Sequence, residues 1–240
     1  MPLTPRLLSR PTWPALPTQC AICRDWGPQR LCAACCQRFI AAGPRCERCA
    51  LAVPAGVTVC GACLTRPAPW RSALAAVDYT HPWDQLIAHF KFHAALDLAA
   101  ALARCLGQAW RLSGRAAPSL LLPVPLSAQR LRERGYNQAW ELARRVASRI
   151  GCPADSRLLL RIRDTPHQLA LPIDRRGANV RGAFAVDPLR LDALRGRSVT
   201  VLDDVMTTGA TATEITRVLQ QAGAAEVHWW VLARTPAPGE

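Results

Sequence analysis

The stretch that decides the fold is Val199-Thr-Val-Leu-Asp-Asp-Val-Met-Thr-Thr-Gly-Ala-Thr211. Its apolar, β-branched start predicts a buried strand over Val199–Leu202, and the residues after the loop predict a helix over Thr211–Gln221. Two adjacent acids, Asp203 and Asp204, follow the strand, at the end where open α/β sheets bind their ligands. A strand, a glycine-containing loop and a helix in this order suit a phosphorylated sugar.

The loop between this strand and helix carries groups that bind anions. Gly209 lets the backbone approach a phosphate closely, and the helix start offers N–H groups that have no partner inside the helix. We therefore predict that the loop holds a phosphate and that the acids hold a ribose. The predicted contacts are Asp203, Asp204, Thr207, Thr208, Gly209, Ala210 and Thr211. The alternative is a solvated aspartate pair at a strand edge, followed by an ordinary capped helix.

Four Cys-x-x-Cys pairs occupy the N-terminal part of the chain. Each pair presents two thiolates in a tight turn, and two pairs complete the closed tetrahedral site that structural Zn²⁺ occupies. Sequential pairing predicts one zinc site from Cys20, Cys23, Cys32 and Cys35, and a second from Cys46, Cys49, Cys60 and Cys63. Interleaved pairing, and Cys36 in place of Cys35, are alternatives. Unrelated buried or redox-active thiols are the contrary interpretation.

Composition favours a cytoplasmic protein with an anionic partner. The chain has 240 residues, 50% of them hydrophobic, which suits one α/β domain plus a smaller unit. Met1–Gln19 lacks the apolar core of a secretory signal, and no later stretch is long enough to span a bilayer. We therefore expect a soluble, cytoplasmic protein without membrane insertion. The formal net charge of +13 favours polyanions.

The remainder of the chain alternates strand and helix patterns. Strands are predicted over Ala73–Tyr79, Ser119–Val124 and Ala225–Val231, and helices over Pro82–Trp110, with a break near Lys91–His93, and over Ala139–Ile150. Trp229 and Trp230 point to opposite faces of the last strand, so at most one is expected in the core.

A second candidate for anion binding follows the strand that ends at Val124. Ser127 lies in a turn, and Arg130, Arg132 and Arg134 form a basic cluster after it, which suits a pyrophosphate. Taken alone, the same pattern is also typical of a solvated basic loop.

Lys91 is the one lysine among 30 basic residues. An isolated lysine in an arginine-rich chain suggests a position that prefers a compact ammonium group, although a surface lysine without a role is the alternative. The basic, poorly periodic segment from Arg161 to Phe184 is expected to form a mobile loop that closes over phosphates.

These motifs together resemble the ComF family of competence-related, phosphoribosyltransferase-like proteins. The resemblance covers roughly residues 20–233, through the four cysteine pairs, Lys91-Phe92, Pro123–Ser127, Arg134–Gln138, a segment with Thr165, Gln168, Arg175, Asn179 and Phe184, and Asp203–Thr211. His93 departs from the family, which usually has a small residue there. The resemblance implies a tail over 1–19, a double zinc ribbon over 20–66, and a type I phosphoribosyltransferase-like α/β domain over 71–235, with a mainly parallel sheet flanked by helices.

The resemblance also implies a function. Such proteins bind 5-phosphoribosyl-1-pyrophosphate (PRPP) with Mg²⁺ and handle single-stranded DNA in natural transformation, alongside other proteins of the DNA-uptake machinery. The PRPP contacts it implies are Asp203, Asp204, Thr207, Thr208, Gly209, Ala210, Thr211, Ser127, Arg134 and Lys91. Arginine-rich loops would hold the DNA backbone, and aromatic side chains such as Trp70, Trp83 or Tyr136 would stack on bases.

Two other functions stay open. The first is a true phosphoribosyltransferase for an unidentified base or amine, in which Asp203 and Asp204 orient the sugar as oxocarbenium character develops. The second is a scaffold whose site is vestigial. Because the chain ends soon after its last predicted strand, we expect no C-terminal hood over an acceptor and favour ligand binding over turnover.

Overall fold

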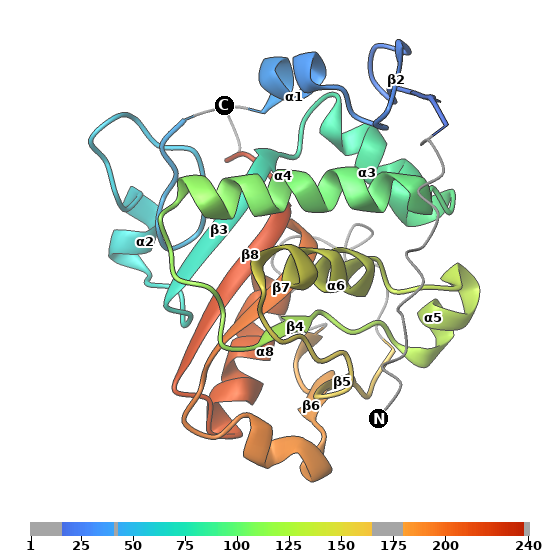
Figure 1. Ribbon diagram of the computed structural model, residues 1–240. Helices are drawn as coiled ribbons and strands as arrows, with labels where there is room; N and C mark the ends of the chain where they lie inside the picture. The colour runs from blue at the N-terminus through green and yellow to red at the C-terminus, as the bar shows by residue number, and fades with distance from the viewer. Residues whose placement is uncertain (1–15, 41–42, 165–179, 238–240) are drawn as a thin grey trace, which may run out of the picture.

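A computed structural model of the chain describes residues 16–40, 43–164 and 180–237 (Figure 1). The cysteine-rich segment contains β1 (Thr18–Gln19), β2 (Trp26–Gly27), α1 (Ala33–Phe39) and α2 (Gly61–Thr65). The remainder contains, in chain order and with η marking 3-10 helices, β3 (Ser72–Asp78), α3 (Trp83–Phe92), η1 (Leu96–Leu98), α4 (Ala99–Leu112), β4 (Leu121–Pro123), α5 (Ala128–Arg134), α6 (Gln138–Ile150), β5 (Leu159–Arg161), β6 (Phe184–Val186), η4 (Pro188–Ala193), β7 (Ser198–Met206), α8 (Ala210–Gln221) and β8 (Glu226–Arg234).

A four-stranded parallel sheet in the order β3-β8-β7-β4 forms the centre of the molecule. Parallel neighbours require crossover connections, and the helices that supply them cover both faces: α4 and α6 lie on one face and α8 on the other (Figure 1). The predicted fold class, a cysteine-rich N-terminal unit followed by a mainly parallel sheet flanked by helices, is confirmed. All four strands end at the same edge of the sheet.

Two hydrophobic clusters form the core, one on each face of the sheet. Trp230 packs in the cluster that contains α4 and α6, and Trp229 packs in the cluster that contains α8. Their side chains are 2% and 1% exposed, so the prediction that at most one lies in the core is wrong. The prediction assumed a half-exposed strand, whereas β8 lies between β3 and β7 and is covered on both faces.

The predicted elements flanking the acid pair are present, with one difference. β7 continues through both aspartates to Met206 instead of ending at Leu202, because β8 pairs with it as far as Met206 opposite Arg234. The long predicted helix is divided into α3 and α4, with the break at 93–98, as expected. No helix in the described ranges has the length and apolar character needed to cross a membrane.

Candidate functional site

The loop Thr207–Gly209 joins β7 to α8 at the carboxyl edge of the sheet. Gly209 adopts φ of +79°, in the left-handed region, immediately before α8. A Cβ atom on Gly209 would lie 3.0 Å from Cη2 of Trp70, so the loop backbone packs directly against that indole. Glycine is required here both for the backbone conformation and for the close approach. The first turn of α8 opens onto this loop, which is the arrangement in which helix N–H groups bind anions.

The acid pair lies in the last part of β7 and is held by Lys91. Nζ of Lys91 lies 2.8 Å from Oδ2 of Asp204, whose residue is 2% exposed. Burial opposes ionisation of Asp204, but the Lys91 ammonium outweighs it, so the pKa of Asp204 is lowered. Burial and the charge of Asp204 raise the pKa of Asp203 well above its ordinary value. The pair therefore favours one ionised and one protonated carboxyl group.

Lys91 is positioned by contacts on both sides of it in the last turn of α3. The hydroxyl of Tyr136 donates a hydrogen bond to the carbonyl of Phe90, and the guanidinium of Arg134 lies 5.3 Å from the ring centroid of Phe92. Burial opposes the charge on Lys91, but Asp204 and Asp203 raise its pKa, so the ammonium form is retained. The end of α5 and the residues after it thus fix the cation that faces the acid pair.

The turn after β4 reaches the same edge. The N–H of Val124 donates to the carbonyl of Leu202 at 2.9 Å, so the chain leaves the sheet beside the acid pair. Ser127 is 2% exposed and caps α5 by accepting from the N–H of Arg130. Nδ2 of Asn137 donates to the carbonyl of Val124 at 3.0 Å and closes the turn. This turn is therefore rigidly attached to β7.

Arg134 is the member of the basic cluster that interacts with the acid pair. Burial lowers its pKa, and the charges of Asp204 and Asp203 act in the opposite direction. Its Nη1 also donates to Oε1 of Gln138, which directs the guanidinium. A fixed guanidinium and an ammonium next to two carboxyl groups can bind phosphate oxygens and ribose hydroxyls at neighbouring positions.

The sequence-predicted site residues therefore fall into three groups. Lys91 and Arg134 interact with Asp203 and Asp204, and the loop residues Thr207, Thr208, Gly209, Ala210 and Thr211 follow the acids directly. Ser127 borders them on the same edge, although within the described ranges no hydrogen bond joins it to the acid pair. Thr165, Gln168, Arg175 and Asn179, in the expected closing loop, lie outside the described residues.

Sequence reasoning missed Arg234. This residue ends β8, is 8% exposed, and donates hydrogen bonds to the carbonyls of Met206 at 3.0 Å and Thr207 at 2.6 Å, at the start of the anion loop. The available signal was a basic residue directly after the apolar run of the last strand. The strand predicted over Ala225–Val231 stops before Arg234, whereas β8 continues to it.

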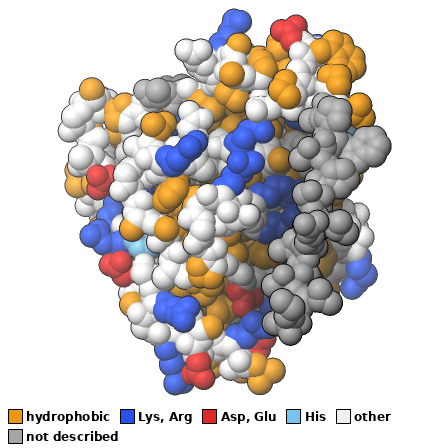
Figure 2. All heavy atoms as spheres, in the orientation of Figure 1, with side chains coloured by type: hydrophobic (Ala, Val, Ile, Leu, Met, Phe, Trp, Pro, Cys, Tyr) orange, Lys and Arg blue, Asp and Glu red, His pale blue; other side chains and the backbone are white. Residues whose placement is uncertain are grey.

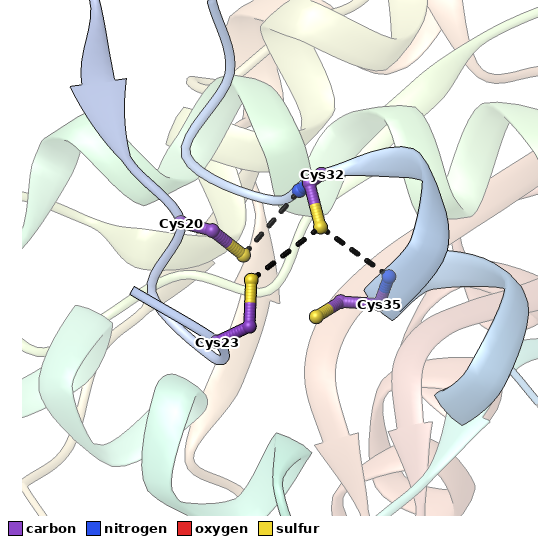
Figure 3. Close-up of side chains that lie close together, drawn as sticks. All are labelled: Cys20, Cys23, Cys32 and Cys35. Carbon is purple, nitrogen blue, oxygen red and sulfur yellow. Dashed lines mark hydrogen bonds between the residues drawn. The ribbon is translucent and has the colours of Figure 1, made fainter. Parts of the chain in front are cut away.

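The structure gathers the eight cysteines in the sequential arrangement. The two groups are Cys20, Cys23, Cys32 and Cys35, drawn in Figure 3, and Cys46, Cys49, Cys60 and Cys63; within each, the sulfur atoms all lie within 4.8 Å of one another. In Figure 3 the side chains converge from two segments, the turn after β1 and the start of α1. Cys36 is not in this group and instead interacts with the thiol of Cys105.

Both cysteine groups have the dimensions of a tetrahedral thiolate site. A metal with bonds of about 2.3 Å to four sulfurs requires sulfur atoms about 3.8 Å apart. The Sγ atoms of Cys23 and Cys32 are 3.7 Å apart, and those of Cys49 and Cys60 are 3.6 Å apart. Burial of Cys46 favours its neutral thiol, but backbone N–H groups, including that of Cys60, outweigh it and lower its pKa to about 7, whereas burial raises the pKa of Cys49 to about 11. The spacing of the sulfur atoms fits a closed, structural zinc site.

The aromatic residues predicted to stack on bases are largely buried. Trp70 and Trp83 are 5% and 2% exposed, and their indole N–H groups donate to the carbonyls of Arg48 and Phe39. The interpretation of these two tryptophans as stacking platforms is wrong, because they join the cysteine-rich segment to the rest of the molecule. Tyr136 is half-buried and is engaged with α3.

Comparison with curated proteins identifies relatives along nearly the whole chain. The DNA utilization protein YhgH of Salmonella typhi is 35% identical over 232 residues, 92% of this chain and 98% of the relative. YhgH of Escherichia coli strain K12 is 33% identical over 230 residues, with the same two coverages. Competence protein F of Haemophilus influenzae is 32% identical over 203 residues, 83% of this chain and 88% of the relative. No protein-family model matches the chain.

Comparison with solved structures gives matches of low overall similarity. Adenine phosphoribosyltransferase from Leishmania tarentolae is matched with a TM-score of 0.40 and 14% identity, over 68% of this chain and 91% of that one. Glutamine phosphoribosylpyrophosphate amidotransferase from B. subtilis is matched with a TM-score of 0.38 and 22% identity, over 55% of this chain and 25% of that one.

Proposed function

Because the chain belongs to the family of DNA utilization protein YhgH and competence protein F, we propose that it binds PRPP and single-stranded DNA and acts in DNA uptake. The observation that best supports PRPP binding is the ion pair between Lys91 and Asp204, since Asp204 lies a few residues before the loop that contains Gly209. A ribose 5-phosphate needs hydroxyl acceptors and an anion pocket a few ångströms apart, and β7 and its loop offer both. Lys91 and Arg134 supply the positive charge for a pyrophosphate.

The metals of this proposal have different roles. Zinc would be held by the two four-cysteine groups, where a closed ligand set contributes folding energy and leaves no open position for chemistry. Mg²⁺ would be held with PRPP near Asp203 and Asp204 and would neutralise negative charge on the pyrophosphate. Of the two carboxyl groups, Asp204 is the one held ionised by Lys91 and thus the better acceptor for a ribose hydroxyl.

A basic groove supports the nucleic-acid part of the proposal. It lies between α1, β3 and α4, has a volume of about 1120 Å³, and its described lining includes one acid, Glu47, and the arginines Arg45, Arg104, Arg111, Arg115 and Arg149. Figure 2 shows basic side chains along the α4 face of the molecule. Arg111 and Arg149 are exposed and form no ion pair with any described residue, so they are free to meet phosphates.

Calorimetric titration tests the PRPP part. PRPP with Mg²⁺ should bind the zinc-loaded protein, and Asp204→Asn should weaken binding about tenfold or more, because it removes the charge that Lys91 faces. Asp155→Asn is the matched control, since Asp155 is also ion-paired, to Arg190, but lies outside the site. Equal affinity in Asp204→Asn and in the wild type would contradict the assignment of the site.

The salt dependence of DNA binding tests the nucleic-acid part. Replacing Arg111 and Arg149 together by glutamine should weaken binding of an oligo(dT) and reduce the slope of log K against log salt by up to about 1.4, at about 0.7 for each phosphate contact. Arg195→Gln is the control, because Arg195 is also exposed but lies outside the groove. An unchanged slope in the double variant would place DNA elsewhere on the molecule.

The alternative function, transfer of phosphoribose to a base or amine, uses the same residues. Asp203 and Asp204 would then orient the sugar while the bond to pyrophosphate breaks. Release of pyrophosphate that depends on an added acceptor and is lost in Asp204→Ala would establish the transferase. PRPP binding without pyrophosphate release across a broad set of acceptors would favour the binding function.

A further inference from the structure

The second cysteine group and the anion loop are joined by one buried side chain. Arg234 donates from Nε to the carbonyl of Cys49 at 2.9 Å, and from Nη1 to the carbonyls of Met206 and Thr207 at 3.0 and 2.6 Å. Nη1 also donates to the carbonyl of Thr235 at 2.8 Å. Because the guanidinium is rigid and planar, a shift of Cys49 displaces the carbonyls on its other side or breaks their hydrogen bonds.

A second bridge runs in parallel through Trp70. Its Nε1 donates to the carbonyl of Arg48 at 2.6 Å, and Nη1 of Arg48 donates back to the carbonyl of Trp70 at 3.2 Å. The far edge of the same indole lies against Gly209, at the position that a Cβ atom would approach to 3.0 Å. Arg48 lies between the two ligand cysteines Cys46 and Cys49. The turn of the cysteine pair is therefore fixed to both ends of the loop.

The loop also lines a small pocket. This pocket has a volume of about 20 Å³, is partly open to solvent, and is formed by residues of β7, of the loop and of the first turn of α8, together with Trp229 and Val231. Lateral contacts hold the loop around this pocket. Those contacts include Arg234 at Met206 and Thr207 and Trp70 at Gly209.

The first cysteine group lacks this connection. Within the described ranges its neighbourhood is tied to α3 and α4, through Nε1 of Trp83 to the carbonyl of Phe39 and Nη2 of Arg104 to the carbonyl of Leu31. In the part of the chain that the structure describes, no hydrogen bond joins Cys20, Cys23, Cys32 or Cys35 to residues 206–209. The molecule thus contains an internal control, since two similar groups differ in their attachment to the anion loop.

We propose that the second cysteine group and the anion loop form one coupled unit, in which metal held by Cys46, Cys49, Cys60 and Cys63 preorganises the loop for a phosphate. Arg234 and Trp70 are the positioning residues. The inference rests on the proposed function of the loop and goes beyond it. Coupling is reciprocal, so a phosphate bound in the loop must increase the zinc affinity of the second group by the same factor that zinc increases phosphate affinity.

The test measures zinc affinity of the full-length protein by equilibrium competition with a chromogenic chelator, with and without saturating ribose 5-phosphate. This probe carries the 5′-phosphate but not the pyrophosphate, which would itself chelate zinc. We expect the affinity of the second group to rise about fivefold or more, which is the usual lower range of coupling, and that of the first group to change less than twofold. A Cys23→Ser variant assigns the two zinc ions.

Variants separate coupling from general packing. Arg234→Lys replaces a multi-donor fork by a single ammonium and should reduce the effect of ribose 5-phosphate on zinc affinity to less than twofold. Arg45→Lys is the matched control. Arg45 donates hydrogen bonds to the carbonyl of Ala50, next to Cys49, and to Asp78, and has no hydrogen bond to the loop among the described residues. Trp70→Phe provides a second break in the connection if Arg234→Lys does not fold.

Three results would overturn the coupling. If ribose 5-phosphate binds in calorimetry but leaves zinc affinity unchanged, the coupling fails while the proposed function stands. If both cysteine groups respond equally, the effect is a general stabilisation and the role of Arg234 is refuted. If ribose 5-phosphate does not bind the wild-type protein, the proposed function of the loop and the coupling fail together.

Discussion

Replacing Gly209 by alanine should damage the anion loop by two separable effects. The first is the left-handed backbone, with φ of +79°, which costs a residue with a Cβ about 1–2 kcal/mol. The second is contact with Trp70: the new Cβ would lie 3.0 Å from Cη2, whereas carbon atoms prefer about 3.5–4.0 Å. Trp70 cannot easily retreat, because its Nε1 is bonded to Arg48 and its ring packs on Trp229 at a centroid distance of 6.3 Å. Overpacking of this kind adds about 1–3 kcal/mol.

Gly151→Ala isolates the first effect. Gly151 has a similar φ of +74°, at the end of α6, but a Cβ there would meet no atom within 4 Å. At about 2–4 °C per kcal/mol for a chain of this size, Gly151→Ala should lower the melting temperature of the zinc-loaded protein by about 2–8 °C and Gly209→Ala by about 4–20 °C. Only Gly209→Ala should weaken PRPP binding. Trp70→Phe removes the contacting ring atoms, so it should lower the cost of Gly209→Ala. Equal losses in the two alanine variants, with no rescue by Trp70→Phe, would refute the steric argument.

Three further outcomes are expected. Lys91→Met should lower the free energy of unfolding at neutral pH by about 3–5 kcal/mol, because it leaves a buried carboxylate without its partner. Because the pKa of Asp204 is lowered in the folded state, the ion pair stabilises the protein above the ordinary carboxyl pKa, and this stabilisation is lost as the pH falls through the lowered pKa. The unfolding free energies of the wild type and of Lys91→Met should therefore converge in acid. A difference between them that does not change with pH would contradict this. Removal of metal with a strong zinc chelator should lower the melting temperature, and Zn²⁺ but not Mg²⁺ should restore it; indifference to the chelator would exclude the metal sites. Tyr136→Phe should cost about 1 kcal/mol and weaken PRPP binding by loosening α3, whereas Tyr79→Phe, whose hydroxyl has no hydrogen-bond partner among the described residues, should do neither.

Features that depend on neighbours in the chain could be predicted from the sequence. The spacing of the cysteine pairs determines which thiols can converge, and the order of apolar, acidic and glycine residues determines the strand, loop and helix at 198–221. The break between α3 and α4 belongs to the same class, since it follows from the local pattern around Lys91–His93.

Features that depend on the order of strands in the sheet could not be predicted in this way. Trp229 and Trp230 are both buried because β8 lies between two other strands. The residues around them do not indicate where β8 lies in the sheet. Arg234 meets Met206 through the register of β8 on β7, and meets Cys49 through the packing of a segment from the other end of the chain. The residues around an arginine at the end of a strand predict neither of these two contacts.

The acid pair shows how such a non-local contact creates a chemical difference. Asp203 and Asp204 are identical residues in adjacent positions, and two buried neighbouring carboxyl groups cannot both ionise cheaply. Lys91, delivered by α3 and secured by Tyr136, touches Asp204 and so decides which of the two carries the charge. A protonated Asp203 can donate a hydrogen bond while an ionised Asp204 accepts one. Of the two hydroxyls of a ribose, one can accept from Asp203 and the other can donate to Asp204. Asparagine at 204 therefore removes a charge that the site is built around, whereas asparagine at 203 exchanges one neutral donor for another.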